Sequence, residues 1–156
     1  MKTLIMLSAV PAAGKSTWAK RFQAEHENVY IISSDDIRLE LTHGDYHDRS
    51  KQNEVWIEFD RRIHEYANKG ENVTVILDAL NDVNEVRLKY LRNTPEYDRK
   101  ILALFPTTLE KSLKFNSTRP ETAKVPDDVL VELNNKFEEP SPGVLALVDG
   151  VITIKW

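Results

Sequence analysis

The chain has 156 residues, of which 41% are hydrophobic and 29% are charged, the composition of one compact globular domain. It contains no cysteine, which excludes a disulfide framework, a thiolate zinc site and a cysteine nucleophile, and favours a reducing, cytoplasmic setting. The net charge is −4 and no apolar run approaches the ~20 residues of a membrane span, so we expect no membrane contact, and any nucleic acid must bind a local basic patch.

Short apolar runs alternate with helical patterns along the chain. The runs are rich in β-branched residues and are typical of buried strands, and the segments between them carry apolar residues at helical spacing. This alternation predicts one α/β domain over residues 1–156, with a central, mainly parallel sheet and helices on both faces. The predicted strands are 4–7, 29–32, 73–77, 101–105 and 151–154; the predicted helices are 15–26, a short one after residue 34, 50–69, 83–92, 107–115 and 127–138; a loop is predicted at 138–143.

The helix predicted over residues 50–69 has an apolar face that is expected to pack on the sheet. Its end is marked by Lys69 in the last turn and by Gly70, which stops the helix. The side chains expected near this face are Val55, Ile57, Phe59, Ile63 and Tyr66.

A phosphate-binding loop follows the first predicted strand. Residues 9–17, AVPAAGKST, match the pattern GxxxxGK[ST] except that Ala9 replaces the first glycine, a departure that matters only if this position needs a positive φ. Lys15 is expected to be solvated beside an anion, and the Ser16 hydroxyl is expected on Mg²⁺. A plain strand-to-helix turn is the alternative. The residues expected to bind the nucleotide here are Ala12, Ala13, Gly14, Lys15, Ser16 and Thr17.

Two acids follow the second predicted strand, in the segment SSDDIR. Neighbouring parallel strands end at one edge of a sheet, so Asp35 or Asp36 is expected to face the phosphate held by Lys15. A carboxylate there could accept the proton of an attacking hydroxyl, and Arg38, on the same helix face as Asp35, could hold an anionic acceptor. Acids in a first helical turn also stabilise the helix whatever the function, so at least one of the pair is expected to be structural.

Motifs over nearly the whole chain resemble the kinase domain of the bacteriophage polynucleotide 5′-kinase family. The resemblance implies an adenylate-kinase-like, three-layer P-loop NTPase fold, ATP and Mg²⁺ as cofactors, and location in the host cytoplasm if the chain is phage-encoded. The motifs that carry it are PxxGKSTWA (11–19), DDIR (35–38), EFD (58–60), ILDALN (76–81), NSTR (116–119) and VPDDVL (125–130).

The resemblance also implies roles on the triphosphate side of the reaction. The residues matching Lys15 and Ser16 bind the phosphates and the metal in that family. The arginine matching Arg119 acts from a lid, here about residues 116–125, on the phosphate being transferred. A solvated loop is the alternative for this polar segment.

Three matches concern the acceptor. The resemblance implies that Asp35 is the general base, that Arg38 holds the acceptor's 3′-phosphate and that Asp78 helps to position the acceptor. From chemistry alone, Asp78 could equally hold Mg²⁺ through water, because it ends a strand beside the phosphate loop. Both roles for Asp78 stay open.

This chain departs from the family at Ala9, Ala12, Phe115 and the pair Ala79 and Leu80, where relatives have Gly, Gly, Arg and Thr-Asn. The acceptor side is therefore altered and less cationic. The expected activity is transfer of the ATP γ-phosphate to a nucleic-acid hydroxyl, first the 5′-OH end of DNA or RNA. The alternatives are a hydroxymethylated base such as 5-hydroxymethyluracil in DNA, a nucleoside or other small molecule, and a nucleotide-dependent switch without transfer.

Overall fold

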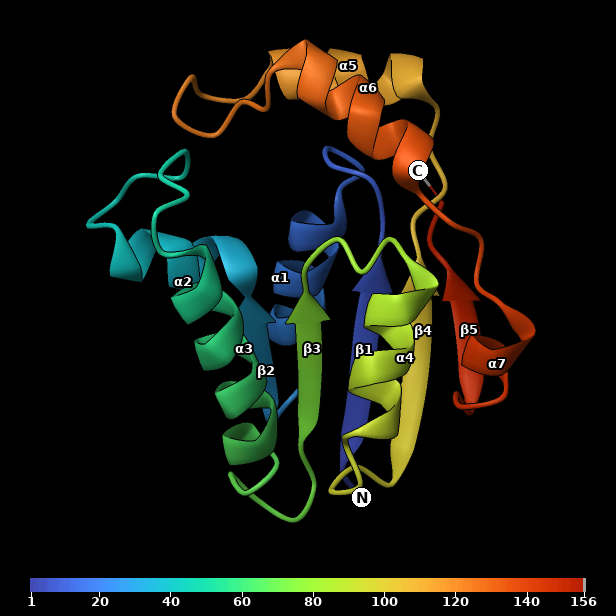
Figure 1. Ribbon diagram of the computed structural model, residues 1–156. Helices are drawn as coiled ribbons and strands as arrows, with labels where there is room; N and C mark the ends of the chain where they lie inside the picture. Colours follow the sequence, from blue (N-terminus) through green and yellow to red (C-terminus); the bar gives the residue numbers. More distant parts are fainter. Residues whose placement is uncertain (156) are drawn as a thin grey trace.

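The computed structural model describes residues 1–155 and has three layers, with a central sheet between helices (Figure 1). All neighbouring strands of the sheet run parallel, in the order β2-β3-β1-β4-β5. The carboxyl ends of β1, β2 and β3 therefore open onto one edge, where the phosphate loop and both acidic segments meet. The strands are β1 (Thr3–Ser8), β2 (Val29–Ser33), β3 (Thr74–Asp78), β4 (Arg99–Leu104) and β5 (Gly150–Thr153).

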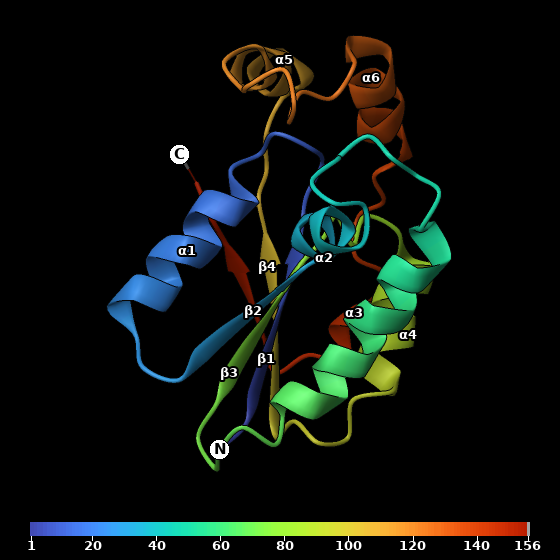
Figure 2. The ribbon, with the colours of Figure 1, turned by 90° about the vertical axis from the view of Figure 1, so that its left-hand side faces the viewer.

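One face of the sheet packs against α3 (Gln52–Tyr66), α4 (Asn84–Arg92) and the short α7 (Pro142–Leu145) (Figure 2). The strands contribute alternate side chains to this core, and Phe59 of α3 is fully buried in it. On the other face α1 (Lys15–Glu25) packs through Ala19 against the remaining strand side chains. Both faces are covered, which explains why the strands appear in the sequence as continuous apolar runs.

A fourth group of elements lies over the carboxyl edge of the sheet. Helices α5 (Leu109–Ser117) and α6 (Asp127–Lys136) stand above the phosphate loop, and the loop between them extends toward α2 (Ser34–Leu41) (Figure 1). From here on we use the name lid for residues 109–136, which contain the shorter segment 116–125 predicted from the sequence. Its joining loop is closed at the base by the Asn116 side chain, which donates to the Val125 carbonyl at 2.6 Å and accepts from the Val125 amide at 3.1 Å.

Two expectations about local structure were wrong. Ile57 is 69% exposed, because it stands two residues, about 200° of helical rotation, from the buried Val55. The predicted loop 138–143 contains the start of α7, where the Ser141 hydroxyl accepts from the Val144 amide at 3.2 Å and Pro142 occupies the first turn. A serine followed by a proline is a signal for the start of a helix. The sequence pattern did not predict α7 because the helix is short.

Candidate active site

The phosphate loop occupies residues 9–14, between β1 and α1. Gly14 and Ala12 both have left-handed backbone, with φ values of 85° and 60°. Ala9 does not, and its amide donates to the Leu80 carbonyl at 2.9 Å. The missing glycine at position 9 therefore costs nothing, whereas Ala12 carries a strain of about 1–2 kcal/mol at the position where the loop turns.

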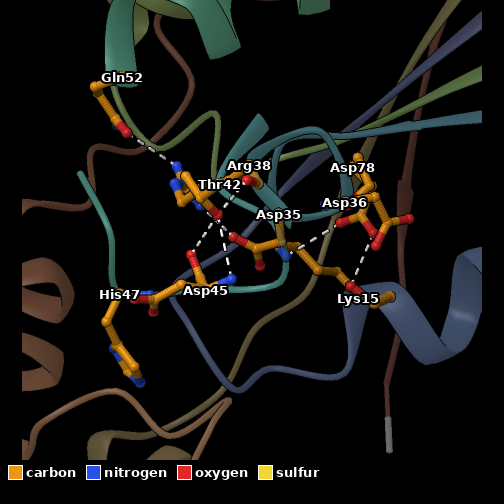
Figure 3. A network of polar contacts seen from close by, with 11 residues as sticks. Lys15, Asp35, Asp36, Arg38, Thr42, Asp45, His47, Gln52 and Asp78 are labelled. Atoms are coloured by element: carbon orange, nitrogen blue, oxygen red, sulfur yellow. Dashed lines mark hydrogen bonds and ion pairs between the residues drawn. The ribbon is translucent and has the colours of Figure 1, made fainter. Parts of the chain in front are cut away.

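Lys15, Ser16 and Asp78 form one cluster at the start of α1, and Figure 3 shows Lys15 and Asp78 within it. The Lys15 Nζ lies 3.1 Å from Asp78 Oδ1, and the Ser16 hydroxyl donates to Asp78 Oδ2 at 2.8 Å. Asp78 is buried and the Lys15 side chain is only 13% exposed, so the expectation of a solvated lysine was wrong. Asp78 is the last residue of β3. Because β3 runs parallel to its neighbour β1, its end lies directly beside the phosphate loop that follows β1.

The oxygen donors of this cluster fit a divalent cation. Mg²⁺ prefers carboxylate, hydroxyl and phosphate oxygens, and the Ser16 hydroxyl and the Asp78 carboxylate lie together at the mouth of the phosphate loop. Sequence reasoning had left Asp78 between the metal and the acceptor. The contacts group it with Lys15 and Ser16.

A buried polar network supports the loop from behind. Arg87 of α4 is fully buried, and its guanidinium donates to the Ser8 hydroxyl at 2.9 Å, the Asn81 carbonyl at 2.8 Å and the Asn84 side chain at 2.8 Å. The Asn81 amide in turn donates to the Leu7 carbonyl at 2.7 Å. These contacts tie the end of β1 to the turn after β3, so the phosphate loop and Asp78 are fixed relative to each other.

Sequence reasoning did not identify Asn81 or Arg87 as site residues. Arg87 lies on a helix among other charged residues, and a buried arginine there has the same sequence pattern as a solvated one. The motif ILDALN contains Asn81, whose φ of 44° marks a tight turn, but only the contacts show what this turn holds.

Asp35 and Arg38 form the second centre of the site, on α2. Arg38 Nη1 donates to Asp35 Oδ1 at 2.7 Å and Nη2 donates to the Gln52 side chain at 3.2 Å. The Arg38 side chain is 4% exposed, whereas that of Asp35 is 55% exposed. Burial lowers the pKa of Arg38, and the nearby charge of Arg49 lowers it further. A guanidinium held in this way is oriented, and the carboxylate beside it faces solvent.

Asp36 has a different environment from Asp35. Its amide donates to the Ser33 hydroxyl, which caps α2, and its side chain points toward Asp78 and Lys15 (Figure 3). Partial desolvation raises the pKa of Asp36, Lys20 opposes this shift, and the charge of Asp78 adds to it. The two neighbouring acids thus face different parts of the site. Asp36 faces the cluster that contains Asp78, and Asp35 faces Arg38.

Tyr46 and Arg119 lie where the two centres approach the lid. Desolvation raises the pKa of the Tyr46 phenol, the charges of Asp35 and Asp36 raise it further, and Arg119 lowers it. Burial lowers the pKa of the Arg119 guanidinium, against the charges of Asp35 and Tyr46. The lid arginine therefore lies near the exposed carboxylate. Tyr46 was missed because a single tyrosine in the polar segment HGDYHD has no periodic signal.

A cleft of about 480 Å³ leads away from the phosphate loop between the lid and the end of β5. Its walls in residues 1–155 come from the loop, from the segment after β4, from α5 and from the end of the chain. Of the predicted nucleotide-binding residues, Ala12, Ala13 and Gly14 line this cleft, whereas Thr17 is exposed in the first turn of α1. No helix in residues 1–155 has both the length and the apolar character that crossing a bilayer requires.

The family model of chromatin associated protein KTI12 matches residues 2–145. Kti12 of Chaetomium thermophilum, solved in complex with ADP-AlF3, has a TM-score of 0.69 and 20% identity, covering 98% of this chain and 89% of that one. A chain of the Pnkp1/Rnl/Hen1 RNA repair complex has a TM-score of 0.73 and 22% identity, covering 86% of this chain. Shikimate kinase from Acinetobacter baumannii has a TM-score of 0.58 and 14% identity, covering 99% and 84%.

These likenesses show the fold, which is that of the P-loop kinases, as the sequence predicted. The chain spans only 43% of the matched chain of the RNA repair complex.

Proposed function

The chain belongs to the family of chromatin associated protein KTI12, and from this premise we propose that it is an ATP-dependent phosphotransferase whose acceptor is a nucleic-acid hydroxyl, first a 5′-OH end. The resemblance to phage polynucleotide 5′-kinases holds at the level of the P-loop kinase class, and the family is a different one. A chain of an RNA repair complex shares the fold, which makes a nucleic acid the first acceptor to test.

The triphosphate half of the reaction belongs to Lys15, Ser16 and Asp78. Lys15 exchanges the Asp78 carboxylate for β- and γ-phosphate oxygens, and the loop amides near Gly14 surround the phosphate at the start of α1. Ser16 and Asp78 are the residues that would hold Mg²⁺. When bound, Mg²⁺ neutralises the charge that develops on the phosphates.

The acceptor half belongs to Asp35 and Arg38. Asp35 takes the proton of the acceptor hydroxyl. The hydroxyl oxygen forms a bond to the γ-phosphorus as the bond from that phosphorus to the β,γ-bridging oxygen breaks, which releases ADP. Arg38 binds a phosphate next to the reacting hydroxyl, because Asp35 and Gln52 orient its guanidinium beside the exposed Asp35 carboxylate. Arg119 stabilises the charge on the transferring group from the lid.

The observation that carries the proposal is the pairing of the two centres across one sheet edge. Ser33, which precedes the acids, pairs in register with Asp78, so the exposed Asp35 carboxylate and the Lys15 cluster flank the same space (Figure 3). A protein that only binds and hydrolyses nucleotide has no need of an oriented arginine and an exposed carboxylate at this position.

A transfer assay with γ-labelled ATP tests the proposal. The acceptors are 5′-OH oligonucleotides of DNA and RNA, a nucleoside 3′-phosphate, the matched free nucleoside and DNA with hydroxymethylated bases. We expect the 3′-phosphorylated nucleoside to exceed the free one roughly ten- to a hundredfold in kcat/KM, because one charge-assisted contact contributes about 1.5–3 kcal/mol. Preference for the free nucleoside would refute the nucleic-acid acceptor, and label only in inorganic phosphate would refute transfer itself.

A further inference from the structure

The cleft beside the phosphate loop has one aromatic side chain among its walls. Phe115 of α5 is 40% exposed, a large fraction for a phenylalanine, and it faces the loop residues Ala12 to Gly14 across the cleft. The Arg119 guanidinium lies over the same ring, 5.8 Å from its centre. The ring is thus held by its neighbour on one side and open to the cleft on the other.

The direction in which a triphosphate must lie in the loop indicates that this cleft holds the nucleoside. The γ-phosphate must point to the acceptor side, where Asp35 follows β2, and the strand order places β2 and β4 on opposite sides of β1. The nucleoside then leaves the loop on the other side, and the cleft lined by Phe115 is the space that begins there. Phe115 lies in the last turn of α5, and Arg119 follows two residues after the helix ends at Ser117, with its guanidinium over the Phe115 ring.

The walls of the cleft can contact the face of a base but have little with which to distinguish its edge. The lining side chains within residues 1–155 include no carboxylate and no amide. The Thr107 hydroxyl both donates and accepts, so it suits the amino group of adenine as well as the oxygen of guanine. Lys111 and Lys155 are donors only, and their charge favours the α- and β-phosphates.

We propose that Phe115 is the base platform of the nucleotide site, so that purine triphosphates are selected by stacking and ATP and GTP bind with similar affinity. The proposal rests on the proposed function only for the orientation of the triphosphate. Stacking needs a π-face, which both purines offer equally and pyrimidines offer with a smaller ring.

Calorimetric binding of Mg²⁺-ATP, Mg²⁺-GTP, Mg²⁺-CTP and Mg²⁺-tripolyphosphate to the full chain tests the platform. Phe115→Ala should weaken both purine triphosphates by the same factor, about 5- to 100-fold, and leave tripolyphosphate unchanged. Phe115→Trp should restore binding, and Phe115→Leu, which keeps apolar volume without a π-face, should not. Val129→Ala removes an exposed apolar side chain from the other lid helix and serves as the matched control.

Three results would overturn the platform: unchanged ATP affinity in Phe115→Ala, an equal loss for tripolyphosphate, or a preference of tenfold or more between ATP and GTP in the wild type. None of these measurements needs an acceptor, so the platform can stand even if no hydroxyl is phosphorylated. Conversely, loss of transfer in Arg119→Ala with unchanged ATP affinity would place the base contact on Phe115 and not on Arg119, as proposed.

Discussion

The two halves of the site are built differently. On the triphosphate side Ser8, Asn81 and Arg87 are buried and joined by hydrogen bonds that link β1, the turn after β3 and α4, and the buried Asp78 accepts from the Ser16 hydroxyl. On the acceptor side the loop of residues 42–51 is held by short-range contacts, such as the Thr42 hydroxyl donating to the Asp45 carbonyl at 2.8 Å. The phosphate loop is therefore fixed by the core of the fold, whereas the helix that carries Asp35 and Arg38 borders a surface loop that can change without disturbing the core.

The largest effect is expected from replacing Lys15, which tests the triphosphate side of the site. Lys15→Met should reduce phosphate transfer below detection, because no other cation within residues 1–155 contacts Asp78 at the loop. It should also lower the melting temperature, since the buried Asp78 carboxylate loses its ion-pair partner.

The double variant Lys15→Met with Asp78→Asn separates these two effects. It removes the uncompensated charge, so the melting temperature should recover while transfer stays absent. Scanning calorimetry and the labelled-ATP assay measure both quantities on the same samples. Turnover near the wild-type rate in Lys15→Met would exclude the phosphate loop from the mechanism.

The acceptor side is tested next, by exchanging the two neighbouring acids one at a time. Asp35→Asn should lower kcat by about a hundredfold or more with little change in ATP affinity, as expected for loss of a general base. Asp36→Asn is the matched control and should be milder, because its carboxylate faces the triphosphate cluster. A reversed order of the two effects would assign the base to Asp36.

The sequence predicted the features of the site that have local signals and missed those that depend on contacts between distant residues. The strands and the loop GKST were predicted correctly because their signals are local, a continuous apolar run followed by a glycine and a lysine at fixed spacing. Arg87 was missed because its hydrogen bond to Ser8 joins residues 79 positions apart, and Tyr46 was missed because a single tyrosine has no periodic signal. The Asp78 contacts with Lys15 and Ser16 cross from β3 to α1, and only the register of β1 and β3 brings them together.

Substituting Arg119 and Arg38 one at a time tests the division between the triphosphate and acceptor sides more sharply, with a smaller expected effect on activity. Arg119→Ala should chiefly lower kcat, because a lid arginine acts on charge in the transition state. Arg38→Ala should chiefly raise KM for a 3′-phosphorylated acceptor, by roughly ten- to a hundredfold, and should leave the free nucleoside unaffected. Steady-state constants for both acceptors decide it. Equal losses of ATP affinity in both variants would contradict the assignment of the arginines to opposite partners.

The smallest expected effect concerns the charge of Asp36 and the pH dependence of stability. Desolvation and the neighbouring Asp78 hold the folded-state pKa of Asp36 above its ordinary value of 3.8. Above the folded pKa the ionised carboxylate therefore lowers stability, and this penalty disappears as pH falls through the folded pKa to 3.8. Asp36→Asn should raise the urea midpoint at pH 7, with a gain that shrinks toward pH 4.

Glu58 supplies the control with the opposite sign. Hydrogen bonds from Arg61 hold the pKa of Glu58 below its ordinary value of 4.5, so its ionised form stabilises the fold above 4.5, and this contribution is lost as pH falls through the folded pKa. Glu58→Gln should therefore lower the urea midpoint at pH 7 and have less effect near pH 4. A lower midpoint at pH 7 in Asp36→Asn would mean that its charge at the start of α2 stabilises the helix more than desolvation costs, and Asp36 would then be the structural acid of the pair.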